Sequence, residues 1–319
     1  MDKYAIGKNK KLQQVADEVE KVIVGKRDVV TILLIALLSG GLGLVEDVPG
    51  VGKTTLALAL GRATGLLSRR AQFTPDVMVS DITGFTMYNK ETNRFEYRQG
   101  LVMANILLAD EINRATPKTQ SALLEAMEEQ TVTVDGVTRP LPDPFMVVAT
   151  QNELGYVGTF PLPEAQLDRF MMKISMGYPT VDQEVSIIAS RQLVDPLENV
   201  IPICTKEDIL SAMATVREIN IEPSVYRYIV ELVAATRNHA AVQLGASPRA
   251  SLALMRAAQS YAFLNSRAYV VPEDALRMVP YIIPHRIRLS QDAKMKRLDV
   301  MDVLREIVKS VKPPFSRGG

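Results

Sequence analysis

The segment formed by residues 46–55 combines the residue types that are needed to hold a chain of phosphate groups. Gly50 and Gly52 allow backbone N–H groups to close around phosphate oxygens, and a helix beginning at Lys53 adds positive potential there. The amine of Lys53 would reach the β- and γ-phosphates, and the hydroxyl of Thr54 would ligate Mg²⁺. The predicted nucleotide-binding residues of this loop are Gly50, Val51, Gly52, Lys53, Thr54 and Thr55.

A second pair of residues suited to this chemistry is Asp110 and Glu111, which follow the apolar run at residues 104–109. An aspartate at the end of such a strand can lie beside the Mg²⁺ of a nucleotide, so Asp110 is predicted to ligate the metal together with Thr54. Glu111 would accept a proton from the attacking water. Apolar strands that end in acidic residues are common and mostly structural. It is the combination with the phosphate loop that favours a catalytic interpretation.

These two motifs must be positioned by a sheet whose strands end at the same level. Strands are predicted at residues 42–46, 71–74, 104–109, 145–150 and 171–176, and most of these segments are apolar runs, as parallel strands covered on both faces require. Apolar residues at helical spacing lie at residues 11–23, 27–39 and 53–64. The alternation predicts an α/β fold with a doubly wound parallel sheet and ligand chemistry at the carboxyl ends of its strands.

Two segments interrupt the alternation and predict β-hairpins inserted into the core. Residues 85–88 and 94–97 alternate in polarity around a polar turn. Residues 131–134 and 137–139 flank Asp135-Gly136, a strong signal for a tight hairpin turn.

The second half of the chain is expected to be helical, since no strand-like run of similar strength appears there. Helical patterns lie at residues 184–193, 206–219, 224–238, 248–264 and 273–281. We therefore divide the chain into a nucleotide-binding α/β core (1–183), a linker helix and hinge (184–204), and an α-helical lid domain (205–319).

Composition and charge argue against several classes of protein. The chain has 319 residues, 47% of them hydrophobic, and a formal net charge of +1, so no overall field attracts nucleic acid or an anionic membrane. A single cysteine, Cys204, and two histidines leave little material for disulfides or a zinc site. Residues 29–45 carry no charge, but their glycines favour a helix and a buried strand over a membrane span. The first residues lack the apolar core of a signal peptide, and we expect a cytoplasmic protein.

Three segments resemble the MoxR family of AAA+ ATPases: residues 46–54, 108–115 and 162–170. The family also has an aspartate at the position of Asp47, where phosphate loops usually have glycine. The resemblance covers almost the whole chain and implies a P-loop NTPase core with a helical lid. ATP and Mg²⁺ would bind between neighbouring subunits of a homo-oligomeric ring, usually of six. The two hairpins match the helix-2 insert and the pre-sensor-1 hairpin of the clade that contains MoxR and magnesium chelatase.

The resemblance also implies roles for residues outside the two motifs. Asn152 falls at the sensor-1 position, where it would orient water against the γ-phosphate, and Arg249 falls at the sensor-2 position at the start of a lid helix. Arg169 matches the arginine finger that reaches the ATP of the adjacent subunit, with Arg114 as a second candidate for that contact. The residues implied to line the adenine pocket are Ile23 and Val24.

The function implied by the resemblance is that of a ring-forming ATPase that remodels or activates protein or metal-cofactor complexes, with a von Willebrand factor A domain protein as partner. A nucleic-acid motor is a rival interpretation, because residues 285–288 and 294–297 form a modest basic cluster. Against it, the chain has no tryptophan and its aromatic content is 6%. An ATPase subunit of the magnesium-chelatase type is a third interpretation, since it shares the hairpin inserts.

Overall fold

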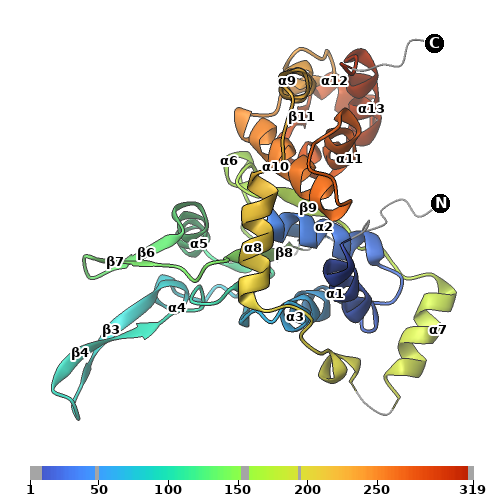
Figure 1. Ribbon diagram of the computed structural model, residues 1–319. Coiled ribbons are helices and arrows are strands. Elements are labelled where there is room, and N and C mark those ends of the chain that lie inside the picture. Colours follow the sequence, from blue (N-terminus) through green and yellow to red (C-terminus); the bar gives the residue numbers. More distant parts are fainter. Residues whose placement is uncertain (1–8, 47–49, 152–157, 193–194, 315–319) are drawn as a thin grey trace.

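The computed structural model describes residues 9–46, 50–151, 158–192 and 195–314 of the chain (Figure 1). Its centre is a five-stranded parallel sheet with the strand order β2-β5-β8-β1-β9. The strands are β1 (Gly43–Glu46), β2 (Ser68–Gln72), β5 (Ile106–Asp110), β8 (Met146–Gln151) and β9 (Met172–Ile174). The predicted α/β core with a parallel sheet is confirmed.

Strands β1, β5, β8 and β9 are largely apolar because both faces of the sheet are buried there. In β1, Val45 joins the hydrophobic cluster on one face, whereas its neighbour Leu44 joins the cluster on the other. Leu108 and Leu107 of β5 divide between the faces in the same way. The helices around the core are α1 (Lys10–Glu20), α2 (Arg27–Leu38), α3 (Lys53–Ala63), α4 (Val79–Thr83), η1 (Ile112–Arg114), α5 (Pro117–Glu129) and α6 (Glu164–Leu167).

The uncharged run at residues 29–45 forms a buried helix followed by a central strand. Every residue of α2 from Val29 to Leu38 is buried, and β1 follows after a short turn. No helix in the described ranges combines the length and the apolar character that crossing a membrane needs.

Strand β2 lies earlier in the chain than the predicted residues 71–74. It occupies an end of the strand order and is largely exposed, so it includes Arg69 and Arg70 and does not form an apolar run. Only the buried Ala71 and Phe73 gave a signal in the sequence, and Phe73 lies just after the strand.

Both hairpins are present and project from the same side of the core (Figure 1). The first consists of β3 (Gly84–Asn89) and β4 (Arg94–Gln99), and the second of β6 (Thr131–Val134) and β7 (Val137–Pro140). Asp135 and Gly136 have φ angles of 52° and 75°, as a two-residue type I′ turn requires.

The remainder of the described chain is mostly helical. Its elements are α7 (Val181–Ser190), η2 (Pro196–Asn199), α8 (Lys206–Arg217), α9 (Pro223–Arg237), α10 (Pro248–Leu264), α11 (Pro272–Ile282), η3 (Pro284–Arg286), α12 (Gln291–Met295) and α13 (Val300–Ser310). We call the part from α8 onward the lid. The lid also contains a short antiparallel ladder of β10 (Val242–Leu244) and β11 (Arg288–Leu289), too short to give an alternating pattern. The domain divisions at residues 183 and 204 stay a prediction.

Candidate functional site

The phosphate loop lies where β1 ends and α3 begins, at the carboxyl end of the sheet. Gly50 and Gly52 have φ angles of 86° and 92°, which side chains other than glycine rarely adopt. Lys53 begins the helix and is buried, with its Nζ 3.5 Å from the carbonyl oxygen of Gln151. The helix N-terminus and the lysine amine therefore face the same point at the end of the sheet, which is a suitable site for phosphate. Residues 47–49 lie outside the described residues.

Thr54 and Asp110 meet at this point, as the two motifs predict. The Thr54 hydroxyl donates to Asp110 Oδ2 at 3.2 Å, across the boundary between α3 and β5. A hydroxyl and a carboxylate are the ligands that Mg²⁺ takes from a protein, with phosphate and water oxygens completing its octahedron. This donor set fits Mg²⁺ bound to a nucleotide, and no cluster of three or more acidic, histidine or cysteine residues occurs in the described residues to hold a metal otherwise.

Asp110 is held ionised by neighbours that the sequence did not reveal. Burial raises the pKa of Asp110. The hydrogen bonds from Thr150 and Arg70 and the charge of Arg70 lower it by more than burial raises it, so the pKa lies below the ordinary value. Thr150 Oγ1 donates to Oδ1 at 2.6 Å, and Arg70 Nη2 donates to Oδ2 at 2.8 Å. The carboxylate is therefore charged at neutral pH and available to a cation.

Glu111 follows β5 in a left-handed backbone conformation with φ 56°. Its N–H donates to Thr150 Oγ1 at 2.9 Å, which links the ends of β5 and β8. Its Oε2 accepts hydrogen bonds from Gln72 Nε2 at 2.8 Å and from Arg114 Nη1 at 2.9 Å. Gln72 lies opposite Asp110 in the β2–β5 register, and it was missed because the sequence did not give this strand pairing. The catalytic role of Glu111 stays a prediction.

We call Lys53, Thr54, Asp110 and Glu111 the phosphate half-site. Asn152, the predicted sensor-1 residue, lies outside the described residues. Ile23 is buried beside the loop, since a Cβ on Gly52 would lie 3.5 Å from Ile23 Cδ1. The predicted role of Ile23 and Val24 at adenine stays a prediction.

Arg169 lies at the opposite, amino end of the sheet. It precedes β9, whose first residue Met172 pairs in parallel with Gly43, the first residue of β1. A four-residue strand such as β1 spans about 13 Å, and the phosphate loop follows its other end. Within one chain, Arg169 therefore lies at the other end of the sheet from Lys53.

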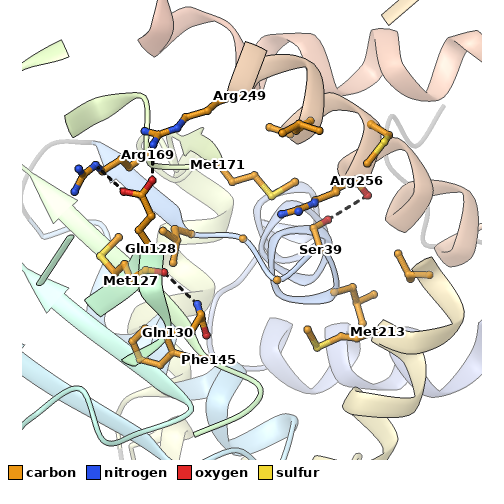
Figure 2. Close-up of a pocket in the computed structure, with 18 of the residues that line it drawn as sticks. Ser39, Met127, Glu128, Gln130, Phe145, Arg169, Met171, Met213, Arg249 and Arg256 are labelled. Carbon is orange, nitrogen blue, oxygen red and sulfur yellow. Dashed lines mark hydrogen bonds and ion pairs between the residues drawn. The ribbon is translucent and has the colours of Figure 1, made fainter. Parts of the chain in front are cut away.

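Arg249 lies beside Arg169, although the two residues belong to the lid and the core. Arg169 Nε is 3.2 Å from Glu128 Oε2, and Arg249 Nη2 pairs with the other oxygen of the same carboxylate (Figure 2). We call Arg169 and Arg249, bridged by Glu128, the arginine half-site. By proximity in sequence, Asp168 and Glu164 are the alternative partners of Arg169, but they pair with Arg286 and Arg288.

The arginine half-site borders a cleft between the core and the lid, with a volume of about 880 Å³. Figure 2 shows Met127 and Phe145 of the core and Met213 of the lid along it. Arg114, the other candidate for a contact in trans, lies at the carboxyl end of the sheet and pairs with Glu111 of its own chain. The structure thus separates the two candidate arginines.

Comparison with known proteins also divides this chain into an ATPase core and a lid. Residues 43–172 match the model of the "ATPase family associated with various cellular activities (AAA)", and residues 234–307 match an AAA lid domain. Chaperone MoxR1 of Mycobacterium tuberculosis is 39% identical over 95% of this chain and 82% of its own length. The uncharacterized protein YeaC of Bacillus subtilis is 50% identical over 96% of each chain. A solved candidate ATPase of Cytophaga hutchinsonii, 39% identical, superposes with a TM-score of 0.89 over 96% of both chains.

Proposed function

This chain belongs to the MoxR family of AAA+ ATPases, and on that premise we propose that it hydrolyses ATP with Mg²⁺ in a ring of identical subunits. The observation that carries the proposal is the separation of its two half-sites. Lys53 and Asp110 lie at the carboxyl end of the sheet, whereas Arg169 and Arg249 lie at the amino end. We therefore propose that a second copy supplies the arginines that complete the site.

A contact between opposite ends of two identical chains is heterologous, and it closes into a ring when its rotation permits. Helix α7 supports such assembly, because Val181, Val185 and Ile188 lie on one face of it and are 78%, 60% and 68% exposed. Figure 1 shows α7 standing apart from the core. An apolar stripe of this kind on a soluble surface is typical of a protein interface. We propose six subunits, as in the related AAA+ rings.

The residues of the phosphate half-site have distinct proposed roles. ATP would supply the phosphate bond that is broken, with ADP as the leaving group, and bound Mg²⁺ would neutralise charge on the phosphate oxygens. Lys53 and the loop N–H groups orient the phosphates, while Thr54 and Asp110 hold the metal. Glu111 takes the proton of the attacking water, because its carboxylate follows directly after Asp110 at the end of β5. Asn152, in the segment after β8, is proposed to orient that water, and Ile23 and Val24 to contact adenine.

The arginine half-site would act on the nucleotide of the next subunit. Arg169, Arg249 and Glu128 are each about a third to a half exposed, so their ion pairs contribute at most about 1 kcal/mol. The arginines can therefore exchange the Glu128 carboxylate for phosphate oxygens at little cost. Two guanidinium groups at that position would stabilise the charge that develops during phosphoryl transfer.

The structure weakens the nucleic-acid motor as an alternative. Of the basic cluster found in the sequence, His285 and Arg286 are buried at the contact between lid and core, which leaves Arg288 and, in a separate segment, Lys294, Lys296 and Arg297 exposed. A surface stripe that binds phosphate backbones needs accessible cations. We propose instead a chaperone-like activity on protein or metal-cofactor complexes, with a von Willebrand factor A domain protein as partner. Support for this partner comes from the family resemblance alone.

Three variants test the proposal. Lys53→Ala should abolish the rise in melting temperature that ATP and Mg²⁺ produce. Glu111→Gln should keep that rise and lose at least about 10²-fold in turnover. Arg169→Ala should bind ATP without hydrolysing it, and mixing it with Glu111→Gln subunits should restore activity, because mixed interfaces contain one complete site. A protein that stays monomeric and does not respond to adenine nucleotides would contradict the proposal.

A further inference from the structure

The backbone segment that carries Arg169 is fastened to the lid by buried polar contacts that the proposed mechanism does not use. We propose that Asp168 and Arg286 are positioning residues that join lid and core, so that Arg169 and Arg249 move as one unit. The inference rests on the proposed ATPase function. It deepens that function by naming residues that set the spacing of the arginine half-site without touching nucleotide.

Arg286 of η3 makes the central contacts. Its Nε donates to Asp168 Oδ1 at 3.0 Å, and its terminal nitrogens donate to the backbone carbonyls of Phe170 at 2.6 Å, Met171 at 3.1 Å and Asp168 at 3.2 Å. The neighbouring His285 Nε2 lies 2.9 Å from the same Phe170 oxygen. The guanidinium of this lid residue therefore forms hydrogen bonds with most of the backbone carbonyls between Asp168 and the start of β9.

Asp168 connects the contacts of Arg286 to the helix that carries Arg249. The Ser247 hydroxyl donates to Asp168 Oδ2 at 2.8 Å and to Oδ1 at 3.1 Å. Ser247 is also the N-cap of α10, where it accepts a hydrogen bond from the N–H of Arg249. The Asp168 carboxylate thus fixes the positions of two backbone segments. Arg169 follows Asp168 directly in the core, and Ser247 begins the lid helix that carries Arg249.

The contact between Asp168 and Arg286 is strong enough for a movement of the lid to move Arg169. Burial, partly offset by the charge and hydrogen bond of Asp168, lowers the pKa of Arg286 to about 10, so Arg286 stays protonated at neutral pH. Disrupting the pair is costly, because it would leave the buried Arg286 guanidinium without its countercharge. A fork of five donors also fixes orientation as well as distance. Rotation of the lid must therefore carry Arg169 with it.

This rigidity has a consequence for a ring. The lid of one subunit and Arg169 of the same subunit cannot move independently. A change in lid position therefore changes where Arg169 lies relative to the phosphate half-site of the next subunit. Misplacement by about 1 Å of a group that positions a reacting phosphate costs about 10²-fold in rate.

The test uses full-length protein with Arg286→Met and Asp168→Asn. Each should lower kcat by about 10²-fold while changing KM for ATP by less than about twofold, because the phosphate half-site of its own chain is untouched. Mixing either variant with Glu111→Gln subunits should restore hydrolysis. Arg169→Ala/Arg286→Met should be no slower than Arg169→Ala, since both changes act through the same group. Arg288→Met is the matched control: Arg288 also joins lid to core, through Glu164 at 3.1 Å, but both partners are exposed.

Normal kcat in rings of both variants would overturn the inference, and so would a double variant whose losses multiply. Should Arg286→Met fail to fold, Asp168→Asn decides alone, because asparagine keeps the volume and can still accept from Ser247. Arg169→Ala separates the two hypotheses. Full activity of Arg169→Ala contradicts the proposed arginine finger, whereas an inactive Arg169→Ala beside active Arg286→Met and Asp168→Asn contradicts only the positioning role.

Discussion

Mild acid should loosen the contact between lid and core through His285. This side chain is buried; its Nε2 lies 2.9 Å from the carbonyl oxygen of Phe170, and its Nδ1 has no hydrogen-bond partner in the described structure. Burial lowers the pKa of His285 well below its usual value, and the charges of Arg286 and Lys173 lower it further. The folded protein therefore keeps the neutral ring with its proton on Nε2, while the unfolded chain takes up a second proton as the pH falls.

The sign and size of the effect follow from this difference in proton binding. Well above pH 6.5 both states hold a neutral ring and His285 contributes no pH dependence. Below it the unfolded state binds more protons, so the free energy of unfolding falls by up to about 1.4 kcal/mol per pH unit. The loss between pH 7.5 and pH 5.5 should total about 1.4 kcal/mol, and it continues until the pH reaches the lowered pKa of the folded state.

Urea unfolding at pH 7.5 and 5.5 measures this loss in the wild type and in His285→Gln. Glutamine can still donate to the Phe170 carbonyl but does not titrate, so the variant should lose about 1.4 kcal/mol less than the wild type on acidification. His239→Gln, at a half-buried histidine that contacts Glu306, should keep the His285 contribution. Equal losses in the wild type and His285→Gln would refute the reasoning, because carboxylates common to both would then account for the whole pH dependence.

Three further predictions concern the two half-sites and assembly. Thr150→Val should destabilise the fold by about 1–3 kcal/mol in urea unfolding and reduce hydrolysis, because it removes the hydrogen bond to the Asp110 carboxylate and the one from the Glu111 N–H. Thr150→Ser should retain most of the stability and the hydrolysis. Val185→Asp should abolish ring formation in light scattering and leave the melting temperature of the monomer unchanged, whereas Val230→Asp, at a similarly exposed valine of α9, should still assemble. Arg114→Ala should lose turnover that mixing with Glu111→Gln subunits does not restore, since Arg114 contacts Glu111 of its own chain; restored activity would place Arg114 at the neighbour's site.

The phosphate half-site was predictable because its signals are local. Residues 50–54 follow a buried strand and begin a helix, and Asp110 ends another strand, so sequence order alone brings them to one end of a parallel sheet. The Asp135-Gly136 turn was visible for the same reason, since a two-residue hairpin specifies its own backbone.

The supporting contacts of that half-site were not predictable, because they depend on strand pairing. Arg70 and Gln72 reach Asp110 and Glu111 only through the β2–β5 register, and β2 is an exposed strand with a weak apolar signal. The ladder of β10 and β11 escaped for a similar reason, since two or three residues give no period to detect.

The arginine half-site shows most clearly where sequence reasoning ends. A family resemblance named Arg169 and Arg249, but no local pattern relates Glu128 to either of them, or Asp168 to Arg286 across 118 positions. Those contacts determine that both arginines face away from the phosphate loop of their own chain. Because β1 must span the sheet between the two ends, no side-chain rearrangement within one subunit could bring Arg169 to Lys53. The proposed need for a neighbour therefore follows from the sheet itself, and hydrolysis at the full rate by a monomeric variant would contradict it.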